Sequence, residues 1–287
     1  MTCATRVHWY RNLEARYPFG RTSPDPERWE PIGFPPPWED RPWIYGVMVA
    51  SANGVVAWSR KAGGDDPVLT VLGGDNTRRE RIADRRQMRF YRAFGDAGIG
   101  AQTNRDQPRL VQTPQEPGDE PVPELYRFRV EHGLPYHPRN IIYSLYGRLG
   151  LDHPVFNMPG LEAIVVTTEA GAGELTTRGA GVRGIPLIVE PCLDPAGLER
   201  AHARLFADRG VRYLACEGGD TILRALHAAR LLDEVFLTVT DVEIDESEHE
   251  GVLKIFDFAR EGAELIAEGR IAPDSGFTFR RWRFNRR

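Results

Sequence analysis

The run Glu217-Gly218-Gly219-Asp220-Thr221 has the residue types and the setting of an anion-binding turn, because it follows a short apolar stretch and opens a helical pattern. Two glycines let a ligand approach the backbone closely. The free N–H groups and the positive dipole end of the following helix attract a phosphate. The alternative is an ordinary strand-to-helix turn with Asp220 or Thr221 as N-cap, since the full Gly-x-Gly-x-x-Gly pattern is absent.

A second turn of similar composition, Gly100-Ala101-Gln102-Thr103, follows the apolar residue Ile99. Thr103 can donate a hydrogen bond to a phosphate, and Arg105 would add positive charge nearby. Asp106 and Pro108 then end the element. A purely structural turn is again the alternative.

Both turns belong to an α/β pattern, in which ligands bind beyond the carboxyl ends of the strands. Strands alternating with helices predict a mostly parallel central sheet flanked by helices. Apolar runs predict strands at 43–49, 97–100, 140–144, 163–167, 185–189, 211–216, 235–239 and 277–284. Helical patterns cover 76–94, 194–210 and 221–229.

Some stretches have clear local signals. Asp194, Pro195 and Gly210 mark the N-cap, the first turn and the end of one helix, whose inner stripe is Leu198, Ala201, His202 and Leu205. In the helix at 76–94, Ala83, Phe90 and Phe94 are expected on one face and many arginines on the other. We expect a turn at Asn53-Gly54, a loop at 61–75 and an inserted excursion at 114–139.

Residues 1–40 differ from the rest of the chain. Their many prolines exclude one regular helix, and their aromatic residues are too numerous for a disordered tail. We predict an extended arm, packed on the body or on a partner subunit, and a single domain at 41–287.

Composition limits the classes of function. The net charge of −4 provides no basic field for nucleic acid. A run of about 18 apolar residues, needed for a membrane span, is absent. The N-terminus lacks the apolar core of a signal peptide, and three cysteines without a Cys-x-x-Cys pair suggest a reducing compartment. A cytoplasmic protein is predicted, with Cys216 as a buried thiol.

Other chemistries lack their signatures. The acidic residues at 241–250 are interpreted as a solvated loop, because they lack the glycine of a calcium loop. His132, His137 and His153 do not have zinc-ligand spacing. The arginines near the C-terminus are interpreted as outward charges on an edge strand. We predict no metal site and assign no catalytic residue.

A set of ordered motifs resembles the C-terminal reductase domain of the bifunctional riboflavin-biosynthesis enzymes, the RibD C-terminal family. The matching pieces are Arg41-Pro42-Trp43, Val49-Ala50-Ser51-Ala52-Asn53-Gly54, Arg92-Ala93, Asp96-Ala97, Gly100-x-x-Thr103, Asp106-Gln107-Pro108-Arg109-Leu110, Glu217-Gly218-Gly219-x-Thr221 and Leu232-Asp233-Glu234. Asn140-Ile141-Ile142-Tyr143-Ser144 is similar to a strand of dihydrofolate reductases whose serine lies near the NADP adenosine phosphate.

The resemblance implies a dihydrofolate reductase-like fold that binds NADPH along the carboxyl edge of the sheet, and a homodimer. It implies hydride transfer to the ribose of a pyrimidine ribosylamine phosphate. Implied contacts with NADPH are Gly218, Gly219, Asp220, Thr221 and Ile222 at the pyrophosphate, Thr103, Asp106 and Ser144 toward the adenosine half, and Val49 and Ala50 at the nicotinamide. Implied substrate contacts are Asn53, Arg92, Leu110 and Glu217.

Departures from the family pattern bear on the substrate and on the phosphate turn. Asn53 stands where the family has aspartate, Thr113 where it has arginine, and Asp220 where it has proline. They favour a retained cofactor with a changed substrate. Two hypotheses therefore remain: an NADPH-dependent reductase of the riboflavin intermediate or another small molecule, and a fold relative that binds a nucleotide or small ligand without turnover, as an assembly partner for example.

Overall fold

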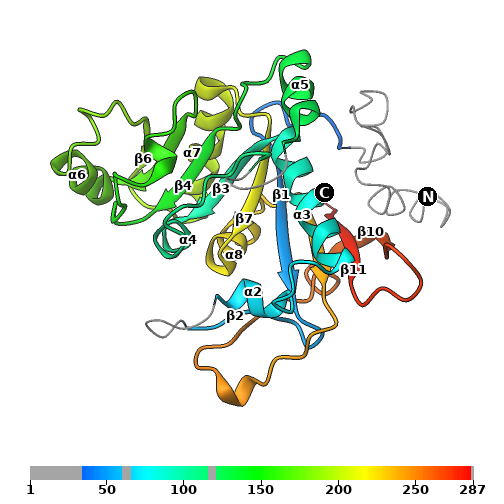
Figure 1. Cartoon of the computed structure of the whole chain (residues 1–287). Coiled ribbons are helices and arrows are strands. Elements are labelled where there is room, and N and C mark those ends of the chain that lie inside the picture. The colour runs from blue at the N-terminus through cyan, green and yellow to red at the C-terminus, as the bar shows by residue number, and fades with distance from the viewer. Residues whose placement is uncertain (1–33, 60–65, 116–120, 286–287) are drawn as a thin grey trace. The chain divides into compact units, whose positions relative to one another are not determined.

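The computed structural model describes residues 34–59, 66–115 and 121–285 (Figure 1). They form two compact units, each described by itself below. The parallel unit contains Pro35–Tyr45 and Arg89–Leu232; the antiparallel unit contains Phe34, Gly46–Met88 and the described part of Asp233–Arg287. Strand β1 (Trp43–Ala50) and helix α3 (Arg79–Phe94) each begin in one unit and end in the other.

Five strands of the parallel unit pair in the order β7-β3-β4-β5-β6, all parallel. Their side chains are mostly buried on both faces, as apolar strands between helix layers must be. The predicted α/β class with a mostly parallel sheet is therefore confirmed. The bounds are β3 (Asp96–Gly100), β4 (Asn140–Ser144), β5 (Ala163–Thr168), β6 (Leu187–Glu190) and β7 (Tyr213–Gly218).

Helices cover this sheet: α4 packs on β3 and β4, α6 on β5 and β6, α7 on β6, and α8 on β7 and β3. The predicted signals of α7 are confirmed: Asp194 Oδ1 accepts a hydrogen bond from Gly197 N at 2.8 Å, and Gly210 is left-handed with φ 66°. The helices are α4 (Ala101–Asp106), α5 (Pro123–Glu131), α6 (Glu169–Thr177), α7 (Pro195–Arg209) and α8 (Asp220–Ala228), with a 3₁₀ turn at Pro154–Phe156.

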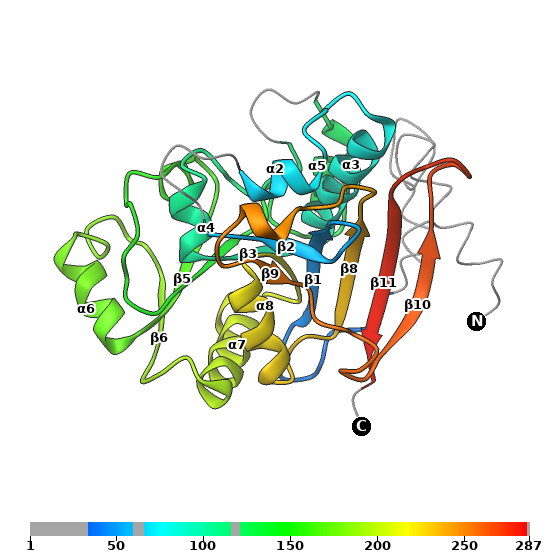
Figure 2. The same ribbon diagram turned by 90° about the horizontal axis from the view of Figure 1, so that it is seen from below.

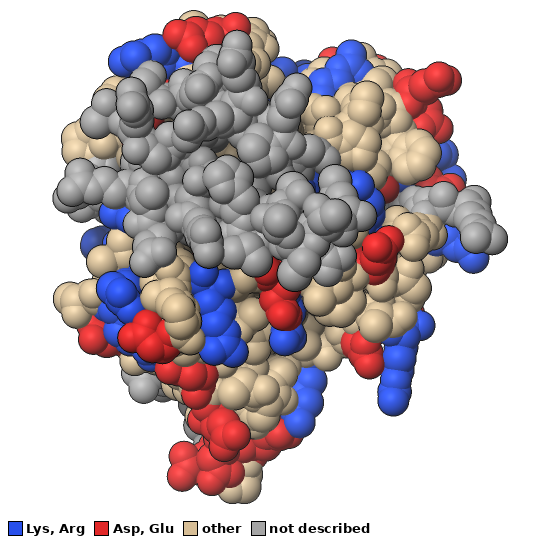
Figure 3. Space-filling view, turned by 90° about the vertical axis from the view of Figure 1, so that its right-hand side faces the viewer, with Lys and Arg blue, Asp and Glu red and all other residues tan. Residues whose placement is uncertain are grey.

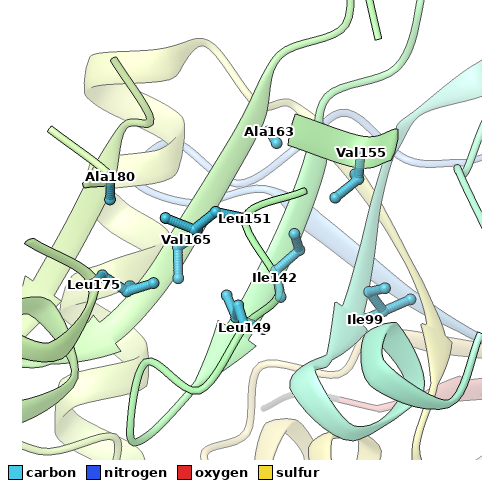
Figure 4. Close-up of a cluster of buried hydrophobic side chains, with 9 residues drawn as sticks. All are labelled: Ile99, Ile142, Leu149, Leu151, Val155, Ala163, Val165, Leu175 and Ala180. Carbon is cyan, nitrogen blue, oxygen red and sulfur yellow. The ribbon is translucent and has the colours of Figure 1, made fainter. Parts of the chain in front are cut away.

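One apolar core lies on the α6 face of this sheet (Figure 4). Ile99, Ile142 and Val165 lie in register on three neighbouring strands and point to the same side. Leu175 of α6 and Leu149 from the loop after β4 pack against them. This core fixes β3 and β4, whose carboxyl ends carry predicted site residues.

The opposite face of β4 packs on α7 through a buried polar pair. Tyr143 Oη lies 2.8 Å from His202 Nε2, and His202 Nδ1 lies 2.7 Å from the Leu198 carbonyl oxygen. Because a carbonyl only accepts, Nδ1 carries the proton and Nε2 accepts from the tyrosine. Burial lowers the pKa of His202 to about 4 and raises the pKa of Tyr143 well above its usual value. The predicted inward position of His202 is confirmed, and its side chain is a neutral hydrogen-bonded link between β4 and α7.

The antiparallel unit contains strands β8 (Glu234–Val239), β10 (Ala263–Gly269) and β11 (Thr278–Phe284), paired in the order β10-β11-β8 (Figure 2). A separate ladder joins β2 (Val55–Ala57) to β9 (Leu253–Lys254). Helix α2 (Pro67–Val71) and a 3₁₀ turn at Glu246–Glu248 complete it.

The prediction that the arginines near the C-terminus are outward charges on an edge strand is wrong for Arg281, while Arg286 and Arg287 lie outside the described residues. Strand β11 lies between β8 and β10, and Arg281 is buried. Its Nε donates to Glu234 Oε2 at 2.6 Å, and Arg283 Nε donates to Glu234 Oε1 at 2.7 Å. Two arginines two positions apart on one strand face thus satisfy one buried carboxylate.

Several other expectations need correction. Of the stretch 61–75, expected as a loop, residues 61–65 lie outside the described residues, and the remainder contains α2 with Asp66 as N-cap. The excursion at 114–139 contains α5, and α6, β2, β9 and β10 were not expected at all. Of the arginines of α3, Arg79 and Arg85 are exposed, as expected of many of them, whereas Arg81, Arg89 and Arg92 are buried. The predicted buried state of Cys216 is confirmed.

Most of the predicted arm lies outside the described residues. Its last residues pack on their own chain: Phe34 meets Phe236 edge to face at 5.8 Å, and Trp38 stacks on Trp43 at 6.0 Å.

On the face shown in Figure 3, basic and acidic side chains are interspersed. Among the described helices, none has the length and apolar character that a bilayer crossing requires.

Candidate cofactor site

The turn after β7 leads directly from the strand into helix α8. Strand β7 ends at Gly218, and Gly219 is the N-cap of α8 with φ 72° and ψ 120°. That conformation strongly favours glycine. Gly219 is the N-cap and no side chain caps the helix start, so the N-cap role expected for Asp220 or Thr221 in an ordinary strand-to-helix turn is wrong. The first N–H groups of α8 are therefore left for a ligand or solvent.

The two predicted turns lie side by side. A Cβ atom added at Gly218 or at Gly219 would lie 3.7 Å from Thr103 Oγ1. The proximity follows from the sheet, because β3 and β7 are parallel neighbours whose carboxyl ends share one edge. A hydroxyl donor and an uncapped helix start thus face the same small region of the parallel unit.

An irregularity in the ladder sets this alignment. Gly98 of β3 lies opposite Cys216 of β7, but Ile99 lies opposite Gly218. Glu217 is therefore an extra residue in the register of β7. Irregularities of this kind bend a strand and redirect a side chain, and they are common beside active sites.

Ser144 lies at the same edge, as the last residue of the neighbouring strand β4. Its carbonyl accepts a hydrogen bond from Thr167 Oγ1 at 2.6 Å, which fixes this strand end. Leu145 and Tyr146, which follow, are exposed. An apolar surface and an aromatic ring are thus available beside Ser144, and the sequence did not single them out.

The other charged residues near Thr103 have partners within α4 and the loop after β4. Asp106 Oδ1 accepts from Gln102 Nε2 at 2.8 Å. Arg105 donates to Gln102 Oε1 at 2.5 Å and to the Arg148 carbonyl oxygen at 2.9 Å. Arg105, expected to add charge near the turn, is therefore directed toward the loop that follows β4.

Two residues predicted to face the substrate form one buried ion pair. Arg92 Nε and Nη2 donate to Glu217 Oε1 and Oε2, both at 2.7 Å. Arg92 Nη1 also donates to the Thr113 carbonyl oxygen at 3.3 Å. The half-buried Leu110 belongs to the same connection between α4 and α5. The cation and the acid expected at the substrate end thus neutralise each other.

The position of Arg92 depends on a second buried arginine. Arg129 of α5 donates through Nη1 to the carbonyl oxygens of Arg92, Ala93 and Gly95 at 2.9–3.1 Å. It thereby satisfies the last carbonyls of α3, which have no partner within the helix. Burial lowers the pKa of Arg129 to about 10, which leaves it charged at neutral pH.

The two carboxylate oxygens of Asp220, the first residue of α8, differ in their hydrogen bonding. Oδ2 accepts from Arg224 Nε at 2.5 Å, one helical turn later. Oδ1 is buried and, among the described residues, has no hydrogen-bond partner. The sequence showed Asp220 as a negative charge at a phosphate turn, and the i,i+4 spacing of Arg224 was the signal of its neutralisation.

The remaining predicted residues belong to the antiparallel unit. The Ala50 carbonyl accepts from Thr240 N at 2.9 Å, and Val49 is half-buried. Asn53 has partners at both atoms of its amide: its Nδ2 donates to the Ile244 carbonyl at 2.9 Å, and its Oδ1 accepts from Ser51 Oγ at 2.7 Å and from Ile244 N at 3.2 Å. Asn53 thus holds the 240–250 segment in place. Among the described residues, no group of His, Cys, Asp and Glu has the arrangement of a metal site.

Comparisons with known proteins support the fold. No family model matches the sequence, and no curated protein sequence matches it. Similar solved structures include a pyrimidine reductase-like protein from Corynebacterium diphtheriae, with a TM-score of 0.58 and 20% identity over 86% of this chain and 94% of that one. RibD from Acinetobacter baumannii gives a TM-score of 0.59 and 15% identity over 86% of this chain and 59% of that one.

A third match is a diaminohydroxyphosphoribosylaminopyrimidine deaminase/5-amino-6-(5-phosphoribosylamino)uracil reductase from Thermotoga maritima, with a TM-score of 0.56 and 15% identity. The match covers 86% of this chain and 58% of that protein. These matches establish a fold shared with pyrimidine reductase-like proteins, the predicted dihydrofolate reductase-like α/β architecture.

Proposed function

We propose that this chain is an NADPH-dependent reductase related to the RibD C-terminal family. The observation that carries the proposal is the convergence of Thr103 with Gly218 and Gly219 at the uncapped start of α8. A diphosphate bound there would accept hydrogen bonds from the free N–H groups and from the threonine hydroxyl. NADPH would supply the hydride.

In this proposal each part of the dinucleotide has its own contacts. Gly218, Gly219, Asp220, Thr221 and Ile222 would hold the pyrophosphate. Thr103, Asp106 and Ser144 would lie toward the adenosine half, and Val49 and Ala50 would contact the nicotinamide through their backbone. The carbonyl of Ala50 already accepts from Thr240 N, so its position is fixed before a ligand arrives.

The substrate is proposed to be a small molecule that contacts Asn53, Arg92, Leu110 and Glu217. Reduction of a pyrimidine ribosylamine phosphate is the first candidate reaction, given the activity named for the Thermotoga protein. A different small molecule is the second candidate. It is favoured by the internal neutralisation of Arg92 by Glu217, which lessens the positive charge available to a substrate phosphate. We also propose a cytoplasmic homodimer.

Binding and turnover should be tested separately. NADPH at about 100 times its dissociation constant should stabilise the native state by roughly 2.7 kcal/mol, seen as a higher melting temperature. No thermal shift and no calorimetric signal with millimolar NADPH or NADH would contradict the cofactor assignment. Loss of NADPH absorbance with the pyrimidine ribosylamine phosphate identifies the first reaction. Tight binding without turnover of any candidate substrate would favour a non-catalytic nucleotide-binding relative.

A further inference from the structure

The start of α8 combines an attractive and a repulsive element for a phosphate. The uncapped N–H groups and the helix dipole favour an anion, with an effect confined to the first turn. Asp220 places a carboxylate in that same first turn. A carboxylate and a phosphate at one helix start compete for the same dipole and repel each other.

Burial makes the repulsion strong unless it is compensated. The side chain of Asp220 is only 5% exposed, and its Oδ1 is buried without a hydrogen-bond donor among the described residues. Charges shielded from water interact through a lower effective dielectric constant than surface charges do. A buried acceptor without a donor is also rare in folded proteins. Solvent therefore contributes little to screening this carboxylate.

Arg224 supplies the compensation. Its Nε donates to Asp220 Oδ2 at 2.5 Å from the next turn of the helix, and its own side chain is 46% exposed. Among the described residues, the Asp220 carboxylate accepts this hydrogen bond at Oδ2 and none at Oδ1. The net charge of the pair is zero, so the helix dipole remains the main field at the turn.

We propose that Arg224, through its ion pair with Asp220, sets the affinity of the α8 turn for the diphosphate of the cofactor. The inference rests on the proposed function, since it assumes that a dinucleotide binds here. Arg224 acts on the ligand through Asp220 and is a positioning residue. Because Asp220 is charged, phosphate binding at this turn depends on the exposed Arg224. With an uncharged residue in place of Asp220, no arginine would be needed to neutralise it.

The experiment is a double-mutant cycle read out by calorimetric titration with NADPH. Arg224→Gln leaves the Asp220 carboxylate unpaired and should weaken binding by about tenfold. Asp220→Asn removes the repulsion and should bind NADPH at least as tightly as wild type. The double variant Asp220→Asn/Arg224→Gln should recover wild-type affinity. The loss in Arg224→Gln should shrink as salt is raised.

Two controls sharpen the cycle. Arg204→Gln removes an exposed arginine of α7 from the same unit and changes the net charge equally, so its NADPH affinity should stay within about twofold of wild type. Inorganic pyrophosphate, used as a competitor, should lose affinity in parallel with NADPH in Arg224→Gln. Arg224→Lys keeps the charge and should retain most of the affinity, which guards against a folding defect in the glutamine variant.

The possible outcomes separate the two proposals. If wild-type protein binds neither NADPH nor pyrophosphate, the proposed function fails. If wild type binds but Arg224→Gln binds equally well, the inference is wrong. A double variant as weak as Arg224→Gln also overturns it, because Arg224 would then contact the ligand directly.

Discussion

Arg92 and Glu217 lie 125 residues apart and meet through two parallel hydrogen bonds of 2.7 Å, with side chains that are 4% and 3% exposed. The guanidinium fork matches the carboxylate edge, which makes this geometry specific. Since Glu217 immediately precedes the two glycines, the ion pair anchors the turn to the end of α3.

The first prediction concerns this pair. Glu217→Gln leaves a buried guanidinium without its counter-charge and should destabilise the protein by about 3 kcal/mol or more in urea unfolding. Replacing both partners, as in Arg92→Met/Glu217→Met, should cost clearly less than the single change, because no buried charge then remains. Equal stability of Glu217→Gln and wild type would contradict this prediction, because it would show that water solvates the Arg92 guanidinium.

The second prediction concerns Gly219. Gly219→Val should abolish most NADPH binding, since a side chain there would push the pyrophosphate away from the helix start. The positive φ also makes valine unfavourable, at a cost of roughly 1–3 kcal/mol. Gly74→Val is the matched control, because Gly74 has φ +71° and open space around it. Both variants should lose stability, but only Gly219→Val should lose NADPH in calorimetry; unchanged binding would make this turn purely structural.

The third prediction follows from His202. Its folded pKa of about 4 lies below the ordinary 6.5, so the unfolded chain binds the extra proton between these values. The stability contributed by neutral His202 is complete above about pH 6.5 and is lost as pH falls toward 4, by about 3 kcal/mol in total. His202→Gln should be less stable at pH 7 but should lose correspondingly less on acidification. Parallel pH profiles of wild type and variant, measured by urea unfolding, would contradict this assignment.

The fourth prediction concerns the arm. Deleting residues 1–33 keeps Phe34 and Trp38, whose ring contacts lie within the chain. If the arm crosses a dimer interface, the deletion should shift the species seen by light scattering toward monomer. An arm packed only on its own subunit would lower stability without changing the mass. A wild-type protein that is monomeric at tens of micromolar would exclude the dimer.

The sequence predicted the parallel strands and α7 because their signals are local. Uninterrupted apolar runs identify buried strands, and Asp194, Pro195 and Gly210 mark both ends of α7. Helix α6 was missed because its glycines give it a low helix propensity. Gly171 is required there by packing, since a Cβ atom would meet Thr167 Oγ1 and the Leu145 carbonyl.

The site was predictable where it depended on turn chemistry and unpredictable where it depended on pairing across the sheet. The glycine turn and Thr103 were identified one by one, and only the parallel pairing of β3 and β7 brings them together. The buried partner of Arg92 could not be read from helical periodicity, which gives the face of a residue but not its contacts with other elements. Arg281 of strand β11 was misplaced because its buried partner, Glu234, is 47 residues away in the sequence.

The extra residue in β7 acts as a spacer between two halves of the site. Each residue advances a strand by about 3.3 Å, so a deletion that restored regular pairing after Gly98 would shift Gly218 by roughly that distance relative to Thr103. That shift is larger than the tolerance of a hydrogen bond. A deletion or insertion at this position of β7 should therefore weaken ligand binding far more than a substitution there. An insertion in the loop after α8, away from β7, should not have this effect.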